Sequence, residues 1–385
     1  MKILVVHNRY QKRGGEDVVF EAETTLLRDG GHTVLPLSIS NDEINSLASR
    51  VTTTFRVADN PAGKKLVANA IDSFRPDIVH VHNFFPLLSP AVFDVCRDKA
   101  VPAVVTLHNF RTICTGGMLL RNGQPCEKCL DSGNIWGVLH RCYRGSLPGS
   151  LASAYMVSTH QRRHTWTRPG LRIIALTGFA RDKFVRAGFD ASMIDVKPNC
   201  VVDPGEPDNG SRQGLVYVGR LSPEKGIDIL LSAVAKTGVP LRIAGDGPEL
   251  PELRKKASAN VTFLGHISPS EVVKEISAAK ALVVPSLWYE GFPMVVAEAF
   301  ACGTPVIASD LGALAEIIQD DNNGMLYPPG NVNTLSKKID YLFGDSGVAE
   351  RCGTQARASY LRAYTPSENL RLLEDIYFRA LNAAK

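Results

Sequence analysis

The 385-residue sequence lacks the segments that would place a protein in or across a membrane. No apolar run approaches the roughly 20 residues that a membrane helix requires. The opening Met-Lys-Ile-Leu-Val-Val-His is too short for a signal peptide. The loop that follows it also lacks Gly-x-Gly-x-x-Gly, which argues against a nicotinamide-dependent dehydrogenase. We therefore expect a soluble, cytoplasmic protein whose only membrane contact is peripheral, on the inner face of the cell membrane.

Acidic residues are absent from one long stretch, Ser132 to Arg181. The net charge of +4 is too mild to imply a nucleic-acid partner. One interpretation of the stretch is a surface for anionic lipid headgroups or a polyprenyl diphosphate, to which each basic side chain contributes about 1 kcal/mol. The other is an ordinary solvated helix face. The arginines concerned are Arg141, Arg144, Arg162, Arg163, Arg168, Arg172 and Arg181.

Both halves of the chain alternate short apolar segments with helical patterns. This alternation predicts parallel sheets covered by helices on both faces, an α/β fold in which ligands bind at the carboxyl ends of the strands. We predict strands in the first half at Ile3–His7, Thr33–Leu37, Asp77–Val81, Ala103–Leu107 and Arg172–Leu176. Strands in the second half are expected near Leu215, Leu241, Val261, Ala281, Thr304 and Met325.

Composition and length favour two domains of ordinary size. Hydrophobic residues make up 44% of the chain, enough for two cores without disulfides. A segment rich in Pro, Asp, Gly and Asn, from Asp203 to Ser211, is the clearest linker. We therefore predict a first domain at 1–203 with a cysteine-containing insertion at about 110–146, a second at 204–364, and a closing amphipathic helix at 365–385.

Three segments of the chain combine a strand, a glycine turn and a helical pattern. These are Gly-Arg-Leu-Ser-Pro-Glu-Lys-Gly after Leu215–Val218, Gly-Asp-Gly-Pro after Leu241–Ala244, and the early Gly14-Gly15. Such turns bring backbone N–H groups close to an anion, and Arg220 and Lys225 would add two fixed cations that suit a diphosphate. Glu290 and Glu298 flank a Gly-Phe-Pro turn, where carboxylates can accept hydrogen bonds from sugar hydroxyls.

These motifs, in this order, resemble the nucleotide-binding domain of the retaining glycosyltransferases of family 4, also grouped as glycosyl transferases group 1. The match includes Pro-Ser-Leu-Trp-Tyr-Glu-Gly-Phe-Pro and Ala-Glu-Ala-Phe-Ala-Cys-Gly-Thr-Pro-Val-Ile-Ala, and it continues more loosely through the first half, where Thr-Leu-His108 follows a strand. The resemblance implies the GT-B fold, with two Rossmann-like domains that face a cleft. It also implies that the last helix packs back on the first domain.

The resemblance also implies roles for single residues. Glu298 would bind the ribose hydroxyls, and Glu290 the donor sugar near its 3- and 4-hydroxyls. His108 would position the sugar, and Gly15 would touch the diphosphate from the first domain. The remaining donor-binding residues are Arg220, Lys225, Gly245, His266, Ile267, Gly291, Phe292, Pro293 and Met294.

The expected chemistry is sugar transfer without a catalytic metal ion or other cofactor. The sequence contains no Asp-x-Asp, the pair by which many other sugar transferases hold a divalent ion. Arg220 and Lys225, with loop amides, would instead stabilise the departing diphosphate. Retention of configuration follows from the resemblance alone. The donor is expected to be GDP- or UDP-linked, and the acceptor a saccharide or a polyprenyl-diphosphate-linked saccharide in bacterial exopolysaccharide or lipopolysaccharide synthesis.

Four cysteines lie in the insertion: Cys114, Cys126, Cys129 and Cys142. Four thiolates with one Cys-x-x-Cys pair can hold a structural zinc ion, which would explain how so long an irregular segment stays ordered. Reduced cysteines without a metal and a redox pair are the two alternatives.

Two alternative functions stay open at this stage. An epimerase-like enzyme acting on nucleotide sugars would require a general base at the sugar carbon, and the sequence identifies none. A non-catalytic sugar-binding subunit would be marked by loss of Arg220, Lys225 or Glu290, and all three are present.

Overall fold

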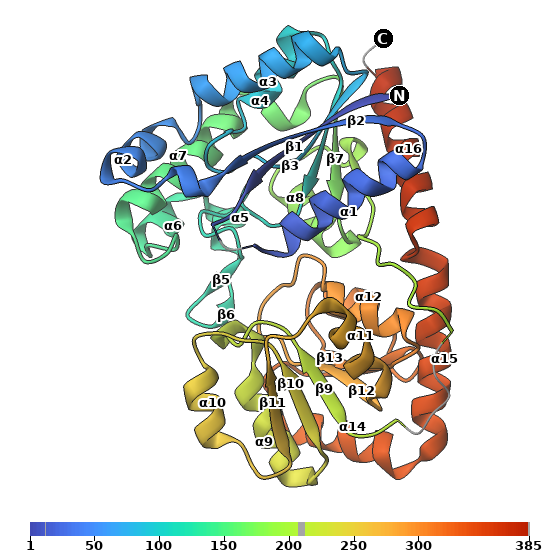
Figure 1. Cartoon of the computed structure of the whole chain (residues 1–385). Helices are drawn as coiled ribbons and strands as arrows, with labels where there is room; N and C mark the ends of the chain where they lie inside the picture. Colours follow the sequence, from blue (N-terminus) through green and yellow to red (C-terminus); the bar gives the residue numbers. More distant parts are fainter. Residues whose placement is uncertain (12, 207–211, 384–385) are drawn as a thin grey trace. The chain divides into compact units, whose positions relative to one another are not determined.

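The computed structural model describes residues 1–11, 13–206 and 212–383 (Figure 1). The chain divides into two compact units. Unit 1 comprises Met1–Arg121, Cys126–Pro198 and Asn369–Lys385, and unit 2 comprises Asn122–Pro125 and Asn199–Glu368. Residues 207–211 of the predicted linker lie outside the described residues. Among the described residues, no helix has the length and apolarity needed to cross a membrane.

Unit 1 is built on a six-stranded parallel sheet with the order β2-β1-β3-β4-β7-β8. The strand order changes direction at β1, so the gap between the carboxyl ends of β1 and β3 is the topological switch point. The sequence prediction missed only β8, because three residues with a central aspartate give no apolar run. The strands are β1 (Lys2–Arg9), β2 (Thr33–Ser40), β3 (Ile78–Asn83), β4 (Ala103–Leu107), β7 (Leu171–Ala175) and β8 (Ile194–Val196).

Helices cover the sheet of unit 1, and the C-terminal helix α16 (Pro366–Ala383) is among them. Its Leu373, Ile376 and Tyr377 share one buried cluster with Ile3 and Phe20. The other helices are α1 (Gly15–Asp29), α2 (Leu47–Arg56), α3 (Pro61–Phe74), α4 (Val92–Asp98), α5 (Lys128–Ser132), α6 (Ile135–Leu139), α7 (Leu147–Arg162) and α8 (Gly178–Arg186). Two short strands, β5 (Leu120–Arg121) and β6 (Gln124–Pro125), lie within the predicted insertion.

Unit 2 repeats the architecture with a six-stranded parallel sheet in the order β11-β10-β9-β12-β13-β14. Its switch point lies between β9 and β12. The strands are β9 (Leu215–Val218), β10 (Leu241–Ala244), β11 (Val261–Gly265), β12 (Ala281–Val284), β13 (Val306–Ser309) and β14 (Gly324–Tyr327). The helices are α9 (Ile227–Thr237), α10 (Leu250–Lys256), α11 (Pro269–Ala278), α12 (Met294–Ala301), α13 (Ala313–Ile317), α14 (Val332–Gly344) and α15 (Ser346–Ala363).

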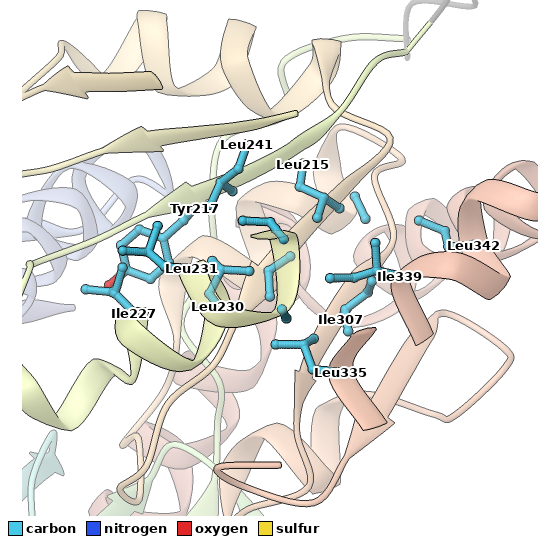
Figure 2. Packing of buried hydrophobic residues seen from close by; sticks show 14 of the residues in the cluster. Leu215, Tyr217, Ile227, Leu230, Leu231, Leu241, Ile307, Leu335, Ile339 and Leu342 are labelled. Carbon is cyan, nitrogen blue, oxygen red and sulfur yellow. The ribbon is translucent and has the colours of Figure 1, made fainter. Parts of the chain in front are cut away.

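Both faces of this second sheet are buried, as the apolar strand sequences predict. Leu215 and Tyr217 of β9 pack with side chains of α9 and α14 on one face (Figure 2). Val216, between them, packs into a separate cluster on the other face together with Phe300 of α12. The α/β class with two parallel sheets is therefore confirmed.

Candidate functional site

Two charged side chains predicted for the site meet at the switch point of unit 2. Lys225 ends a short turn, Pro223–Lys225, that follows β9, and Glu290 lies in the loop that follows β12. Because β9 and β12 are neighbouring parallel strands, their carboxyl ends open into the crevice where ligands bind in such sheets. Lys225 Nζ donates a hydrogen bond of 2.7 Å to Glu290 Oε1.

The Glu290 carboxylate is held by three donors on the same oxygen. Besides Lys225, Ser286 Oγ and Trp288 Nε1 donate to Oε1 at 2.6 and 3.0 Å. The residue is only 7% exposed, and such a buried carboxylate requires these partners to offset its lost hydration. Within the described residues, no side chain bonds to Oε2. This oxygen is therefore the one that can accept a hydrogen bond from a substrate hydroxyl.

The glycines after β9 and β10 serve the close packing of two loops. A Cβ on Gly245 would lie 1.9 Å from the carbonyl oxygen of Gly219, and one on Gly247 would lie 2.2 Å from that of Leu221. The Gly245 amide already donates to the carbonyl oxygen of Gly265 at 2.7 Å. Its expected role as an anion-binding amide is thus not supported by the geometry, and the glycine is explained by backbone contact.

Gly226 ties the Lys225 loop to the Glu290 loop. It has a left-handed backbone (φ +64°), and a Cβ would lie 2.2 Å from the carbonyl oxygen of Pro285. The Leu287 amide also donates to the carbonyl oxygen of Glu224 at 2.8 Å. These contacts fix the separation of the two loops and hence of Lys225 from Glu290.

Gly226→Ala is expected to lower the free energy of unfolding of unit 2 by about 2–3 kcal/mol, from left-handed strain and the Pro285 contact together. Gly238→Ala is the matched control, since Gly238 has a similar φ of +70° and no atom lies within 4 Å of the position of its Cβ. The control should lose only about 1 kcal/mol. Thermal unfolding of both variants checks this, and equal losses would show that the Pro285 contact is unimportant.

The remaining donor-side residues take four different positions in unit 2. Glu298 lies on the second turn of α12, where burial raises its pKa, and its carboxylate has no partner within the described residues. Arg220 is exposed and forms no ion pair with any described residue. Gly291 to Pro293 lead into α12, and the amide of Val296 in its first turn donates to the carbonyl oxygen of Pro293 at 2.9 Å. His266 and Ile267 follow β11, which is separated from β9 by β10.

The switch point of unit 1 holds a cluster of histidines. His7 lies near the end of β1, His80 and His82 lie on β3, and His108 follows β4. His82 Nδ1 lies 3.1 Å from His108 Nε2, and His7 Nε2 lies 2.8 Å from Asp17 Oδ1. Burial lowers the pKa of His7 to about 4 and lowers the pKa of His108 well below its ordinary value. The His7 and His108 rings are therefore neutral at pH 7 and can act as hydrogen-bonding groups.

A buried ion pair lies directly beside the histidines. Lys197 Nζ, fully buried, donates to Glu23 Oε2 at 2.8 Å and to Asn369 Oδ1 at 2.9 Å. Burial alone would raise the pKa of Glu23, but Lys197 and the neighbouring imidazoles hold it well below its usual range. This pair could not be predicted from the sequence, because 174 residues separate its members.

One group of three potential metal ligands is present within the described residues. It consists of Glu23, His80 and His82, whose ligand atoms all lie within 4.8 Å of one another. The Glu23 charge is already balanced by Lys197. Both ring nitrogens of His80 are bonded, to Tyr377 and to Thr106, at 2.8 Å each. A divalent ion would place two more positive charges beside a buried ammonium group. We therefore interpret the group as a charge-compensated network that joins α16 to the sheet.

A small pocket in unit 1 lies at the carboxyl ends of β3 and β4. His82, His108, Asn109 and Arg111 are among its lining residues. The Arg111 guanidinium lies over the Phe85 ring at 4.1 Å, and its Nε and Nη1 are buried with no hydrogen-bond acceptor among the described residues. The sequence prediction found His108 here and missed Arg111, which lies only three residues further on.

Gly15 begins α1, after Gly14 at the N-cap. A Cβ on Gly15 would have no atom within 4 Å, so its surroundings in unit 1 do not require a glycine. The Gly14 amide donates to Asp17 Oδ2 at 2.8 Å. The proposed contact between Gly15 and a diphosphate stays a prediction.

Comparison with known proteins agrees with this geometry. Residues 14–203 match the model of Glycosyltransferase Family 4, and residues 205–359 match that of Glycosyl transferases group 1. An uncharacterized glycosyltransferase of Methanocaldococcus jannaschii is 34% identical over 301 residues, which cover 76% of this chain and 73% of the relative.

Two solved structures share the fold over nearly the whole chain. Sucrose-phosphate synthase from Thermosynechococcus elongatus has a TM-score of 0.75 at 18% identity and covers 100% of both chains. The Anabaena protein HepE, solved in complex with UDP-glucose, has a TM-score of 0.67 at 20% identity over 97% of this chain and 99% of its own. The expected GT-B class is therefore confirmed.

Proposed function

The chain belongs to the glycosyltransferases, and from this premise we propose that it is a hexosyltransferase that uses the unit 2 switch point to bind a UDP- or GDP-linked sugar. The observation that carries this proposal is the Lys225–Glu290 pair, which places a cation and a free carboxylate oxygen side by side. The cation suits the diphosphate and the carboxylate suits the sugar hydroxyls. An epimerase-like enzyme or a non-catalytic subunit is the alternative.

The proposed transfer needs no catalytic metal ion and retains the anomeric configuration. Lys225 and Arg220 would stabilise the diphosphate as it leaves and gains negative charge. Glu290 is engaged by three donors on one oxygen, so we assign it to binding the sugar and not to nucleophilic attack. Attack on the same face as the departing diphosphate is the route that this arrangement supports.

A donor screen tests the proposal. Purified protein is heated with GDP, UDP or ADP, or with their sugars, each with and without EDTA. A ligand that binds only the folded state raises the melting temperature by mass action. A shift with UDP or GDP that survives EDTA is expected. No shift with any nucleotide would favour the non-catalytic alternative, and a shift abolished by EDTA would contradict metal-independent binding.

The unit 1 pocket supports an acceptor that carries phosphate. Two buried Arg111 nitrogens have no acceptor in the part of the chain that the structure describes, and a buried donor without a partner is costly. A phosphate oxygen of a polyprenyl-diphosphate-linked saccharide would supply the missing partner. A neutral saccharide acceptor could bond to the same group more weakly.

Arg111→Met is therefore expected to raise KM for a phosphate-bearing acceptor by about 10-fold or more, the equivalent of one hydrogen bond to a charged group. KM for the donor should stay unchanged. Initial rates with paired acceptors, with and without the diphosphate, check this. An equal rise for both acceptors would show that Arg111 does not recognise phosphate.

Three neighbouring helices of unit 1 expose apolar stripes that suit a membrane surface. In α2, Leu47 and Phe55 are 78% and 79% exposed, and this helix has no buried residue. Helix α7 contacts both α2 and α6 (Figure 1). We define the apolar surface as Leu47, Val51 and Phe55 of α2, Ile135 and Leu139 of α6, and Leu147, Leu151 and Tyr155 of α7.

The charges around the apolar surface favour an anionic membrane, although with fewer arginines than the sequence indicated. Arg163, Arg168 and Arg172 are neutralised by aspartates from other parts of the chain. Arg50, Arg56, Arg141, Arg144 and Arg162 are exposed and have no acidic partner among the described residues. A lipid-linked acceptor in the inner leaflet would be reached from such a surface. With this surface as support, we propose a pathway in bacterial exopolysaccharide or lipopolysaccharide synthesis.

Phe55→Glu is expected to reduce binding to vesicles that contain anionic lipid by about 10-fold, because it removes a large apolar side chain and adds a negative charge. Leu361→Glu is the matched control, since Leu361 is 53% exposed on α15 of unit 2. Vesicle flotation checks both variants. Wild-type binding that is independent of anionic lipid, or equal losses in both variants, would contradict a membrane role for the apolar surface.

A further inference from the structure

The segment 110–146 is ordered although its regular elements are very short. Helices α5 and α6 have five residues each, and strands β5 and β6 have two each. Helices and hairpins of this length are not stable by themselves in water. All four cysteines of the segment are free thiols, so no disulfide holds it. Another cross-link would account for its order.

The four thiols form a continuous series of neighbours. The Cys114 and Cys129 thiols are close enough to interact electrostatically. Cys142 interacts electrostatically with both Cys129 and Cys126. The backbone of Gly116 lies against Cys142, whose Cβ is 3.4 Å from where a Gly116 Cβ would be. The fold thus gathers cysteines from positions up to 28 residues apart into one place.

Backbone groups lie beside two of the four sulfur atoms. The backbone of Gly117 and Leu119 lies beside the Cys114 sulfur, and that of Thr115 and Gly137 lies beside the Cys129 sulfur. Backbone amides can orient metal-bound thiolates and offset their charge. Arg121 adds a cation near Cys142, and its buried Nε has no hydrogen-bond acceptor.

We propose that Cys114, Cys126, Cys129 and Cys142 bind one structural Zn²⁺ ion in a tetrahedral site. Each thiol loses its proton as its sulfur coordinates the ion. Tetrahedral Zn–S bonds of about 2.3 Å place the sulfur atoms about 3.8 Å apart. No three of these four described sulfur atoms lie within 4.8 Å of one another, so the ion would draw the thiols together. This site is separate from the proposed donor site, which lies in unit 2.

Metal analysis of the full-length chain tests the proposal. Protein purified without chelator, or refolded with Zn²⁺, is expected to hold about one zinc per chain. Cys129→Ser should lose it. Cys200→Ser is the matched control, because Cys200 is also half-buried but lies outside the segment. Wild-type protein that holds no zinc, or a Cys129→Ser variant that keeps a full equivalent, would overturn the proposal.

Cobalt substitution provides a second readout that does not depend on a variant that folds. Co²⁺ bound to wild-type protein should show the intense visible absorption of tetrahedral thiolate coordination, and equimolar Zn²⁺ should remove it. Absorption typical of octahedral coordination would overturn the site. So would an intact mass, under non-reducing conditions, that shows the loss of two hydrogens from a Cys126–Cys129 disulfide. Neither readout depends on the nucleotide-sugar screen, so the two proposals can fail separately.

Discussion

Glu290→Ala should lower kcat by about 10²–10³-fold, the cost of removing one group that stabilises the transition state through preorganised hydrogen bonding. Affinity for the bare nucleoside diphosphate should change by less than about threefold. The reason is that Glu290 Oε2 is available to the sugar, while Lys225 and Arg220 remain to bind phosphate. Initial rates measure the first effect, and isothermal titration with UDP or GDP measures the second.

Two further variants make this test sharper. Glu290→Gln keeps the size of the side chain and removes its charge, so it separates hydrogen bonding to the sugar from simple loss of packing. Glu224→Ala is the control in the same loop, where the carboxylate accepts from Ser222 Oγ at 2.6 Å and does not contact Glu290. Equal losses of activity and nucleotide affinity in Glu290→Ala would show that Glu290 binds the nucleotide and not the sugar.

The sequence predicted the sheets well because their signal is local. Ile3–Val6 and Ala281–Val284 are uninterrupted apolar runs, and parallel strands buried on both faces have this pattern. Helix α2 was not predicted. Its stripe of Leu47, Val51 and Phe55 has helical spacing. The helix, however, is short and threonine-rich, and none of its residues is buried in a core. A helix is recognised in a sequence by the apolar side chains that it buries in a core, and α2 buries none.

In the candidate sites, too, some residues could be predicted from the sequence and others could not. Lys225 and Glu290 could be predicted, since each follows a recognisable strand and turn, and strand order brings them together. The hydrogen bonds from Ser286 and Trp288 to Glu290 could also have been predicted, because all three residues lie within five positions of the sequence. The Glu23–Lys197 pair could not be predicted, because it depends on the packing of α1 against the chain after β8.

This buried pair leads to the largest expected effect on stability. Lys197→Met should lower the free energy of unfolding of unit 1 by about 3–5 kcal/mol, since it leaves the Glu23 carboxylate buried without its cation. Asn369 would also lose its bond to Lys197 Nζ, which weakens the attachment of α16. For a unit of this size, the melting temperature should fall by about 10 °C. Differential scanning calorimetry checks this, and an unchanged melting temperature would contradict the assigned pair.

The double variant Glu23→Gln, Lys197→Met should regain part of the lost stability, because it removes both buried charges.

The pH dependence of the free energy of unfolding separates the contribution of charge from that of packing. In the wild type the folded pKa of Glu23 is lowered, so its stabilising contribution is present above the unfolded pKa and is lost as pH falls through the folded pKa. In Lys197→Met, burial raises this pKa, so the deficit relative to the double variant should shrink as the pH falls from 7 toward 5 and Glu23 takes up a proton. A deficit that stays constant over this range would mean that Lys197 stabilises the unit by packing alone.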